Sequence, residues 1–425
     1  MKEITNAAQF FLIVDFGSTV VHFFLLNCNS QNTIVHGPVE IPTRYFRKSD
    51  PNVLFFQGVS ALEQSAKRKL IAKDILIVSQ ETNRSSGVQR VVLISGEEFY
   101  PQLSVSEIAL KATQEESLEA LFSHLSTLQY CNSLLDIGSS ATRYFYEGNG
   151  QNKKLIAPIG TGASALYVLR QDAQSDLLLR WLTFEMEIVL LENVIANKSV
   201  TPYIIPYLEH DLEIELALVR EILRTTIPAD YDEERAGRNV VLSGAAISRY
   251  PNPNLIGLTY LDGVEPEGVN EIYIDTAQFA TSLGGVIKRY PELVKDVTLS
   301  EIFPHILTTV TVSGTFHEGE SLGQAFINFG FDDNQEIKLE AGNIYHIPSA
   351  AQTLTLEFSF THNAFIRGCP FESDANKSVI KKIKTGKRGL IIDTRGRPLP
   401  LPRLSAEGRE RMRSWIHALD LSNSL

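Results

Sequence analysis

Apolar residues form strand-like and helix-like runs that alternate along the first 130 residues. Strands are expected at 10–15, 19–27, 53–55, 74–79 and 90–94, and helices at 58–70, 104–112 and 115–127. The last helix opens with Glu115 and Glu116, and acidic side chains stabilise a helix N-terminus through the helix dipole. Alternation of this kind predicts a layered α/β domain.

A second cycle of alternating patterns follows. Strands are expected at 134–135, 144–146, 153–157, 239–243 and 272–274, and helices at 163–170, at 277–287 and, in several pieces, across 172–225. Pro202 and Pro206 divide the long helical stretch, because proline lacks the backbone N–H that a helix interior needs. This part of the chain predicts a second α/β domain.

The pattern changes near residue 300 to short β-like runs separated by Gly, Asp and Asn. These runs lie at 307–312, 325–331, 336–339, 344–347, 354–360 and 387–393, and an amphipathic helix is expected at 406–419. Such spacing is typical of a small antiparallel barrel or sandwich. The phrase Asp393–Arg397 reads as a turn between two strands. The expected domains are therefore 1–128, 129–300 and 301–425.

One short phrase occurs in both of the first two domains. Asp15-Phe-Gly-Ser-Thr19 and Asp136-Ile-Gly-Ser-Ser-Ala-Thr142 each stand between two strand-forming runs. Each phrase predicts a β-hairpin whose Gly-Ser/Thr tip can present backbone N–H groups and hydroxyls to an anion. Two such hairpins, one in each half, predict a duplicated fold that closes two loops around a phosphate chain.

The chemistry that fits this pair is the binding of ATP with Mg²⁺. Backbone N–H groups wrap the phosphates, and carboxylates hold hydrated Mg²⁺. A strand followed by Gly244 and Ala245 would form a shelf for the nucleoside. Gly160 and Gly162 precede a helix and could offer N–H groups to phosphate, although glycines there also serve tight geometry.

The candidate residues follow from these roles. Asp15 and Asp136 are expected to act in catalysis and to hold Mg²⁺ through water, unless they only stabilise their own hairpin turns. The expected ATP contacts are Gly17, Ser18 and Thr19 to the β-phosphate, Gly138, Ser139 and Ser140 to the γ-phosphate, and Gly160, Gly162, Gly244 and Ala245.

Composition narrows the class of protein. The net charge of −11, with acidic residues spread along 425 residues, argues against non-specific nucleic-acid binding. A basic group near the end reads as a solvated loop; its members are Lys377, Lys381, Lys382, Lys384, Lys387 and Arg388. The most apolar stretch, 10–28, is broken by polar residues, so no membrane span is expected.

The cysteines point to a reducing compartment. Cys28, Cys131 and Cys369 are odd in number and have no CxxC spacing, so they are expected to be free thiols rather than disulfides or zinc ligands. No secretion signal is visible at the N-terminus. We therefore expect a cytoplasmic protein.

The order of hairpin, hairpin and glycine shelf resembles the actin/Hsp70/sugar-kinase superfamily. More narrowly, the chain resembles the glutamate mutase accessory proteins called MutL or GlmL, over most of its length. The residues that carry the narrower likeness are Asp15–Thr19, Asn83–Val88, Asp136–Thr142, Gly160–Gly162, Arg180–Leu182, Asn197-Lys198, Pro202, Pro206, Leu283-Gly284 and Gly389–Pro400.

The resemblance implies a duplicated actin-like, ribonuclease H-like ATPase fold with an added β-rich module. It also implies an ATP-binding protein that acts on a protein partner, as a chaperone or reactivating factor of a coenzyme B12-dependent mutase; homo-oligomers are also possible. The chain departs from these relatives at His22, where they carry lysine, at Ser139, where they carry glycine, and at Arg143, where they carry an acid. Ala245 replaces a second glycine of the superfamily.

Two other functions stay open. A structural adaptor of the same fold, as in pilus assembly, would tolerate a degenerate cleft. A small-molecule kinase needs a catalytic carboxylate between the hairpins, for which Glu81 is the candidate. Arg143 reads either as a solvent-facing strand residue or as a phosphate contact, and His22 as a packed strand residue.

Overall fold

The contacts of this computed structural model divide the chain into two units. Unit 1 consists of Met1–Tyr130 with Asp275–Ile302, and unit 2 of Cys131–Ile274 with Phe303–Leu425. The three-domain division expected from sequence stays a prediction beside this grouping. The structure describes residues 9–16, 20–28, 33–42, 51–67, 90–95, 109–162, 164–170, 174–202, 204–227, 238–289, 291, 294, 299–330, 333–349, 352–361, 364–369 and 378–420.

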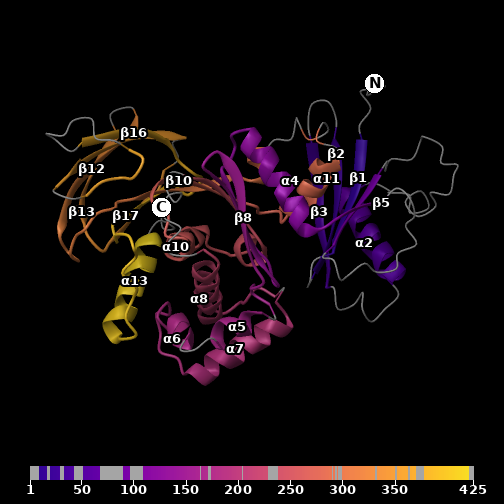
Figure 1. The fold of residues 1–425 in the computed structure, drawn as a ribbon, viewed down its shortest axis with the longest axis horizontal. Coiled ribbons are helices and arrows are strands. Elements are labelled where there is room, and N and C mark those ends of the chain that lie inside the picture. The colour runs from indigo at the N-terminus through magenta and orange to yellow at the C-terminus, as the bar shows by residue number, and fades with distance from the viewer. Residues whose placement is uncertain are drawn as a thin grey trace. The chain divides into compact units, whose positions relative to one another are not determined.

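Unit 1 is built on a mixed five-stranded sheet (Figure 1). Its strand order is β3-β2-β1-β4-β5, in which β1 pairs antiparallel to β2 and parallel to β4. The strands are β1 (Gln9–Phe16), β2 (Val20–Cys28), β3 (Thr33–Pro42), β4 (Arg90–Ser95) and β5 (Ala109–Ala112). The first predicted hairpin is therefore confirmed as the β1–β2 pair.

Four helices of unit 1 are described: α2 (Pro51–Ala66), α4 (Gln114–Thr127), α11 (Ala280–Arg289) and α12 (Leu299–Ile302). Helices α4 and α11 pack closely, because Gly284 has no side chain at their crossing. A Cβ at Gly284 would lie 1.9 Å from the carbonyl oxygen of Ser117. An ion pair of 2.7 Å between Lys288 and Glu116 also joins the two helices.

A capping box starts helix α4. The Thr113 hydroxyl accepts a hydrogen bond from the Glu116 N–H at 3.1 Å, and the Glu116 carboxylate accepts one from the Thr113 N–H at 2.9 Å. A hydrogen bond from Lys288 and the one from Thr113 lower the pKa of Glu116 to about 2. The carboxylate therefore stabilises the helix most when it is ionised.

We expect Thr113→Ala to lower the free energy of unfolding of unit 1 by about 1 kcal/mol. Because the folded-state pKa of Glu116 is depressed, its contribution is present above its ordinary pKa of 4.5 and is lost as the pH falls towards about 2. Glu116→Gln should flatten this acid dependence. Hydrogen exchange of the α4 amides measures both effects, with the exposed Glu301→Gln as control; an unchanged pH dependence in Glu116→Gln would contradict the prediction.

Unit 2 repeats the same sheet. Five of its strands have the order β8-β7-β6-β9-β10, with the two hairpin pairs antiparallel and β6–β9–β10 parallel, as in unit 1. Strands β11, β17 and β14 extend this sheet to eight strands. The strands are β6 (Ser133–Ile137), β7 (Thr142–Gly148), β8 (Gln151–Ala157), β9 (Asn239–Ser243), β10 (Gly268–Ile274), β11 (His305–Thr311), β14 (Ile344–Ile347) and β17 (Leu390–Asp393).

The repeated strand order confirms the predicted fold class. It is an α/β, duplicated actin-like fold of the ribonuclease H-like type, and it carries an added antiparallel β sheet. That four-stranded sheet has the order β13-β12-β15-β16, and its strands are β12 (Ser321–Gly330), β13 (Asp333–Glu340), β15 (Thr353–Phe360) and β16 (Ser378–Lys384). Leu356 and Phe358 of this sheet share an apolar core with Val310 and Ile392 of the eight-stranded sheet.

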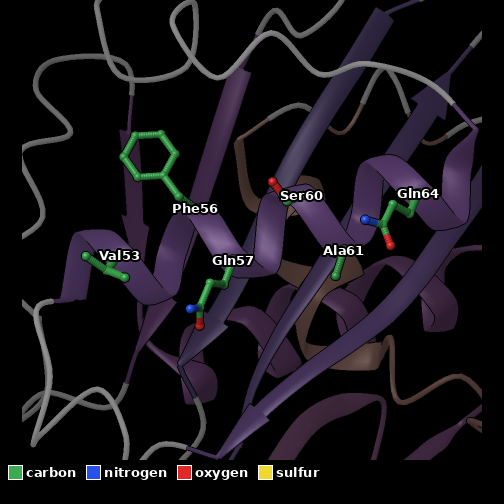
Figure 2. Close-up of a pocket in the computed structure, with 6 residues that line it drawn as sticks. All are labelled: Val53, Phe56, Gln57, Ser60, Ala61 and Gln64. Carbon is green, nitrogen blue, oxygen red and sulfur yellow. The ribbon is translucent and has the colours of Figure 1, made fainter.

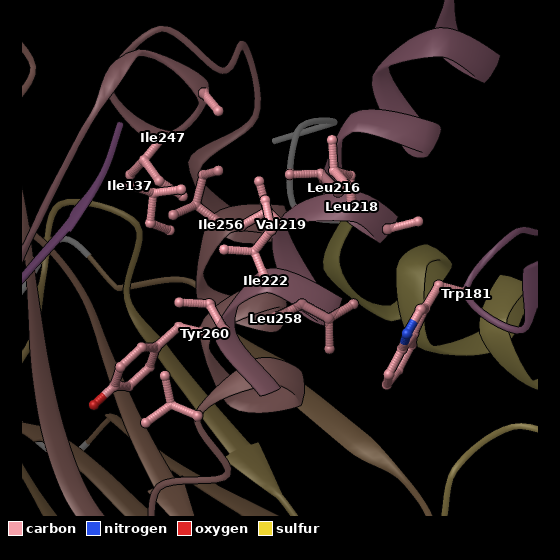
Figure 3. Close-up of a cluster of buried hydrophobic side chains, with 14 of the residues drawn as sticks. Ile137, Trp181, Leu216, Leu218, Val219, Ile222, Ile247, Ile256, Leu258 and Tyr260 are labelled. Atoms are coloured by element: carbon pink, nitrogen blue, oxygen red, sulfur yellow. The ribbon is translucent and has the colours of Figure 1, made fainter. Parts of the chain in front are cut away.

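A large apolar core lies under the helices of unit 2 (Figure 3). Helix α8 supplies Leu216, Val219 and Ile222 to it, and α10 supplies Ile256 and Leu258. The α8 side chains recur at helical spacing, whereas α10 is buried on almost every side. The helices of unit 2 are α5 (Ala165–Arg170), α6 (Gln174–Leu179), α7 (Ile188–Val200), α8 (Glu209–Thr226), α9 (Ala245–Ser248), α10 (Pro253–Gly263) and α13 (Ala406–Asp420).

Three of the sequence-based assignments are wrong. Lys381, Lys382 and Lys384, expected in a solvated loop, lie on strand β16, which pairs with β15. Residues 53–55 belong to helix α2 rather than to a strand, and Leu54, Phe55, Val59 and Leu62 are buried at helical spacing. Residues 109–112, expected in a helix, form strand β5 because they pair with β4. The strand expected at 74–79 lies outside the described residues.

Other expectations concern cysteines and membranes. Cys131, which is buried, and Cys369 are free thiols, as expected. None of the helices in the described part of the chain has the length and apolar character needed to cross a membrane.

Candidate functional site

The carboxyl ends of two neighbouring parallel strands bring the second hairpin beside the predicted nucleoside shelf. Asp136 of β6 is in register with Ser243 of β9. After Asp136 the chain turns within four residues, and the Gly138 N–H donates to the Ala141 carbonyl at 3.0 Å. The structure therefore brings the hairpin tip to the edge of the sheet where β9 also ends.

Gly160 and Gly162 support the hairpin tip from one side. The Thr161 N–H donates to the Gly138 carbonyl at 3.1 Å, and the Gly162 N–H donates to the Ser139 carbonyl at 2.7 Å. A Cβ at Gly160 would lie 2.3 Å from the Gly138 oxygen, so only glycine permits this approach. The two backbone segments are packed against each other, and the Gly162 N–H is engaged within the protein.

The Ser164 hydroxyl completes this support. The Gly160 N–H donates to Ser164 Oγ at 2.8 Å, and the Ser164 hydroxyl donates to the Ser140 carbonyl at 3.4 Å. Ser140 itself is exposed at the tip. Within the described residues, neither its N–H nor its hydroxyl has a hydrogen-bond partner. Ser140 is therefore a donor of the hairpin tip that can meet an anion.

Asp136 is engaged by an arginine. Arg143 Nη1 lies 3.0 Å from Asp136 Oδ2, and both side chains are largely buried. Burial raises the pKa of Asp136 above its ordinary value, while the Arg143 charge and hydrogen bonds from Arg143 and Ser243 act against that rise. Arg143 is therefore not a solvent-facing residue. Its guanidinium neutralises the carboxylate that was predicted to hold Mg²⁺.

The partnership of Arg143 with Asp136 could have been found in the sequence. The two residues face each other in the β6–β7 register, Asp136 with Arg143. A four-residue turn at Gly138–Ala141 fixes that register, and residues directly opposite in an antiparallel pair interact. From the sequence, Arg143 was recognised as the replacement of an acid but was not paired across the hairpin.

Gly244 follows β9 and lies against β6. Its φ of +103° is open to glycine but not to other residues. A Cβ there would lie 2.1 Å from the Ile137 carbonyl oxygen. Ala245 begins the short helix α9 directly after it. The structure therefore brings together Asp136, Gly138–Ser140, Gly160–Gly162 and Gly244-Ala245 in unit 2.

The first hairpin is described in part. Asp15 lies buried on β1, opposite His22 in the β1–β2 register, and Gln114 Nε2 lies 3.5 Å from Asp15 Oδ1. His22 Nε2 lies 3.5 Å from Glu40 Oε1 on the next strand. The predicted contacts Gly17, Ser18 and Thr19 lie outside the described residues, as do Glu81 and 83–88.

The predicted Mg²⁺ site joins residues of both units. Asp15 belongs to unit 1 and Asp136 to unit 2, so their approach to one ion stays a prediction. Within the described residues, no group of three or more His, Cys, Asp or Glu side chains could hold a metal ion directly. A hydrated Mg²⁺ needs fewer protein ligands than such a group supplies.

A separate groove of about 480 Å³ lies on helix α2 (Figure 2). Its lining comes from one helix: Val53, Phe56, Gln57, Ser60, Ala61 and Gln64. None of the predicted site residues that the structure describes lines this groove. It presents no charged group, so it offers a phosphate no positive charge.

Comparison with known proteins finds only distant structural similarities among those described here. No family model and no curated protein matches the chain. Component A of (R)-2-hydroxyglutaryl-CoA dehydratase from Acidaminococcus fermentans is 14% identical, with a TM-score of 0.40, over 68% of this chain and 100% of its own. The activator of 2-hydroxyisocaproyl-CoA dehydratase from Clostridium difficile, with bound ADPNP, is 15% identical, with a TM-score of 0.37, over 67% and 96%.

A third neighbour is the ethanolamine utilization protein EutJ from Carboxydothermus hydrogenoformans. It is 8% identical, with a TM-score of 0.37, over 68% of this chain and 92% of its own. At these identities and TM-scores the neighbours carry no argument about activity. The repeated strand order remains the basis for the fold.

Proposed function

We propose that this chain binds ATP through the glycine-rich edge of unit 2 and uses the bound nucleotide to act on a protein partner. The observation that carries the proposal is the meeting of three segments at the ends of β6 and β9. Those segments are the Gly138–Ser140 tip, Gly160–Gly162 and Gly244-Ala245. The N-terminal hairpin, with Asp15, is the second contact that the sequence predicts.

The residues of unit 2 fit a phosphate chain in a specific way. Ser140 offers an N–H and a hydroxyl without partners among the described residues, and these suit a terminal phosphate. Gly160 and Gly162 act indirectly, since they hold the tip in place. Gly244 lies in close contact with the Ile137 backbone, and this contact places the end of β9, where a nucleoside would lie, beside the hairpin tip. Bound Mg²⁺ would supply positive charge to the phosphates.

Asp136 is the residue whose role separates the possible functions. Its carboxylate pairs with Arg143 at 3.0 Å, so its charge is already balanced. A balanced carboxylate attracts a hydrated cation less strongly than a free one. We therefore expect nucleotide binding with slow hydrolysis.

We expect Mg-ATP to bind wild type in isothermal titration, and Ser140→Ala and Asp136→Asn to weaken binding by about five- to tenfold. Glu357→Gln, an exposed carboxylate on β15, is the matched control and should bind as wild type does. Titration heats and thermal shifts with and without Mg²⁺ measure the effect. If wild type shows neither heat nor a thermal shift, the proposal is wrong.

A structural adaptor is the second candidate, and the Asp136–Arg143 pair favours it. In an adaptor the arginine permanently occupies the carboxylate, and the fold serves as a scaffold. The two functions differ in one measurement, because an adaptor binds its partner with equal affinity in the presence and absence of ATP. Arg143→Gln separates them further, since freeing Asp136 should raise Mg²⁺-dependent hydrolysis only in a nucleotide site.

The narrower proposal is that the partner is a coenzyme B12-dependent mutase that this protein reactivates. Its support is the resemblance carried by phrases such as Arg180–Leu182 and Gly389–Pro400. Recovery of inactivated glutamate mutase on addition of this protein and Mg-ATP tests it. Equal recovery without nucleotide would argue for the adaptor instead.

A further inference from the structure

Helix α7 and the segment after it expose a group of large apolar side chains. We call this group the α7 surface. Its members are Val189, Leu190, Val200, Ile204, Tyr207 and Leu208, and each is at least half exposed, with Tyr207 at 96%. Contiguous exposed apolar groups on soluble proteins mark interaction sites more often than scattered ones do.

The outer face of α7 carries no charged side chain. Leu191 and Ile195 are buried and define the inner face of this helix. Positions 189, 193, 197 and 200 lie on the opposite face, at helical spacing. The polar members of that face are Asn193 and Asn197, which carry no charge. An ordinary solvent-facing helix surface would carry charged side chains there.

A lysine of helix α7 holds the segment that carries Ile204 and Tyr207. Lys198 Nζ donates to the Ile204 carbonyl at 2.6 Å and forms an ion pair of 2.6 Å with the buried Glu215. The Lys198 charge is therefore turned inward and balanced. This contact gives a structural role to Lys198 of the Asn197-Lys198 phrase singled out in the sequence. The α7 surface is thus supported by the core of unit 2.

The edges of the α7 surface are acidic. Glu187 precedes α7, Glu192 lies on it, and Glu209 directly follows Leu208. All three carboxylates are exposed, and none has an ion-pair partner in the part of the chain that the structure describes. Glu185, nearby, lies 3.9 Å from Arg409 and is excluded from this set. An apolar surface with unbalanced negative edges selects a cationic partner.

We propose that the α7 surface docks an amphipathic segment of a partner protein, with apolar anchors on one face and Lys or Arg beside them. Apolar side chains would cover Val189, Val200 and Tyr207, and the basic ones would pair with the three carboxylates. A second copy of this chain fits less well, because a symmetric contact would bring like charges together. The inference deepens the proposed function, since it says how the protein partner is recognised.

The probe is a fluorescein-labelled 18-residue helical peptide of leucine and lysine, with a matched peptide in which glutamate replaces lysine. Fluorescence anisotropy measures binding to the full chain. The triple variant Glu187→Gln, Glu192→Gln, Glu209→Gln should bind the lysine peptide at least about tenfold more weakly, and Val200→Ser with Tyr207→Ser should do the same. The control triple Glu301→Gln, Glu336→Gln, Glu357→Gln removes equal charge from exposed positions elsewhere and should change binding less than about twofold.

Several results would overturn the docking proposal. Equal weakening by both triple variants would mean that the peptide senses net charge alone. Equal binding of the glutamate peptide, or no binding of the lysine peptide at about 100 μM, would contradict it directly. A dimer in sedimentation that Val200→Ser with Tyr207→Ser abolishes would assign the surface to a second copy. Mg-ATP titration of each variant keeps this outcome separate from failure of the nucleotide site.

Discussion

Arg395→Met should lower the free energy of unfolding of unit 2 by about 3–5 kcal/mol. Arg395 is fully buried and joins two buried carboxylates: its Nη1 lies 2.7 Å from Asp262, and its Nε lies 2.9 Å from Asp393. Removing the guanidinium takes one cation from two acids that water cannot reach. Each acid keeps a second arginine, but three buried hydrogen bonds from the Arg395 side chain are lost and water cannot replace their donors. Such a loss costs far more than the loss of an exposed pair.

The network around Arg395 joins several elements of unit 2. Asp262 of α10 also forms an ion pair of 2.7 Å with Arg220 of α8, and Asp393 of β17 forms one of 2.8 Å with Arg397. The Arg395 guanidinium lies 4.6 Å from the Trp415 ring centre, on the terminal helix α13. One side chain therefore ties together helix α10, strand β17 and the terminal helix α13.

Tryptophan fluorescence is a direct reporter for this experiment. The two tryptophans, Trp181 and Trp415, both belong to unit 2, so urea unfolding followed by fluorescence reports on that unit. Arg413→Met removes an exposed arginine of the same terminal helix and should change stability by less than about 0.5 kcal/mol. Arg395→Lys should fall in between, because it keeps the charge but loses the planar fork. A loss below about 1 kcal/mol in Arg395→Met would contradict this account.

The same network predicts a pH dependence. Burial alone would raise the pKa of Asp393, but Arg395 and Arg397 outweigh it and hold that pKa below the ordinary value. A group with a depressed folded-state pKa stabilises the protein above its unfolded-state pKa, and this stabilisation is lost as the pH falls through the folded-state pKa. Wild type should therefore lose stability below about pH 4 more steeply than Asp393→Asn.

The fold could be predicted largely because its signals are local. Each hairpin is a strand, a Gly-Ser/Thr turn and a strand, and the repetition of Asp15–Thr19 as Asp136–Thr142 predicted a duplicated sheet that the structure confirms. Where pairing with a neighbouring strand decides between helix and strand, the sequence alone is ambiguous. Residues 109–112 contain helix-forming side chains yet join the sheet, because β4 offers them a parallel partner.

The buried ion pairs of Arg395 could not be predicted from short sequence segments. Asp393–Arg397 was interpreted as a turn between strands, and its contact with Asp262 crosses more than a hundred residues of sequence. No periodicity encodes which distant acid an arginine will meet. The candidate site shows a similar division, since its glycines were found from the sequence, whereas their support of the Ser139 backbone required the three-dimensional arrangement. The convergence of Asp15 with Asp136 stays a prediction.

Gly244→Ala is expected to destabilise unit 2 by about 3 kcal/mol or more, because two costs add at one position. The φ of +103° is unfavourable for any residue with a Cβ, and that Cβ would lie 2.1 Å from the Ile137 carbonyl oxygen. Gly150→Ala separates the two costs. Gly150 also has a positive φ, +71°, but a Cβ there meets nothing within 4 Å, so its loss should be about 1 kcal/mol.

The pair Gly244→Ala and Gly150→Ala tests nucleotide binding at the proposed site as well as the stability of unit 2. Because Gly244 holds the end of β9 against β6, a methyl group there must push the shelf away from Asp136 and the hairpin tip. Tryptophan fluorescence in urea measures the stability of both variants, and Mg-ATP titration below the unfolding transition measures the site. Gly150→Ala should bind nucleotide as wild type does, whereas the folded fraction of Gly244→Ala should bind more weakly. Equal stability of the two variants would show that β6 yields to the methyl group, and the close approach at Ile137 would then have no structural importance.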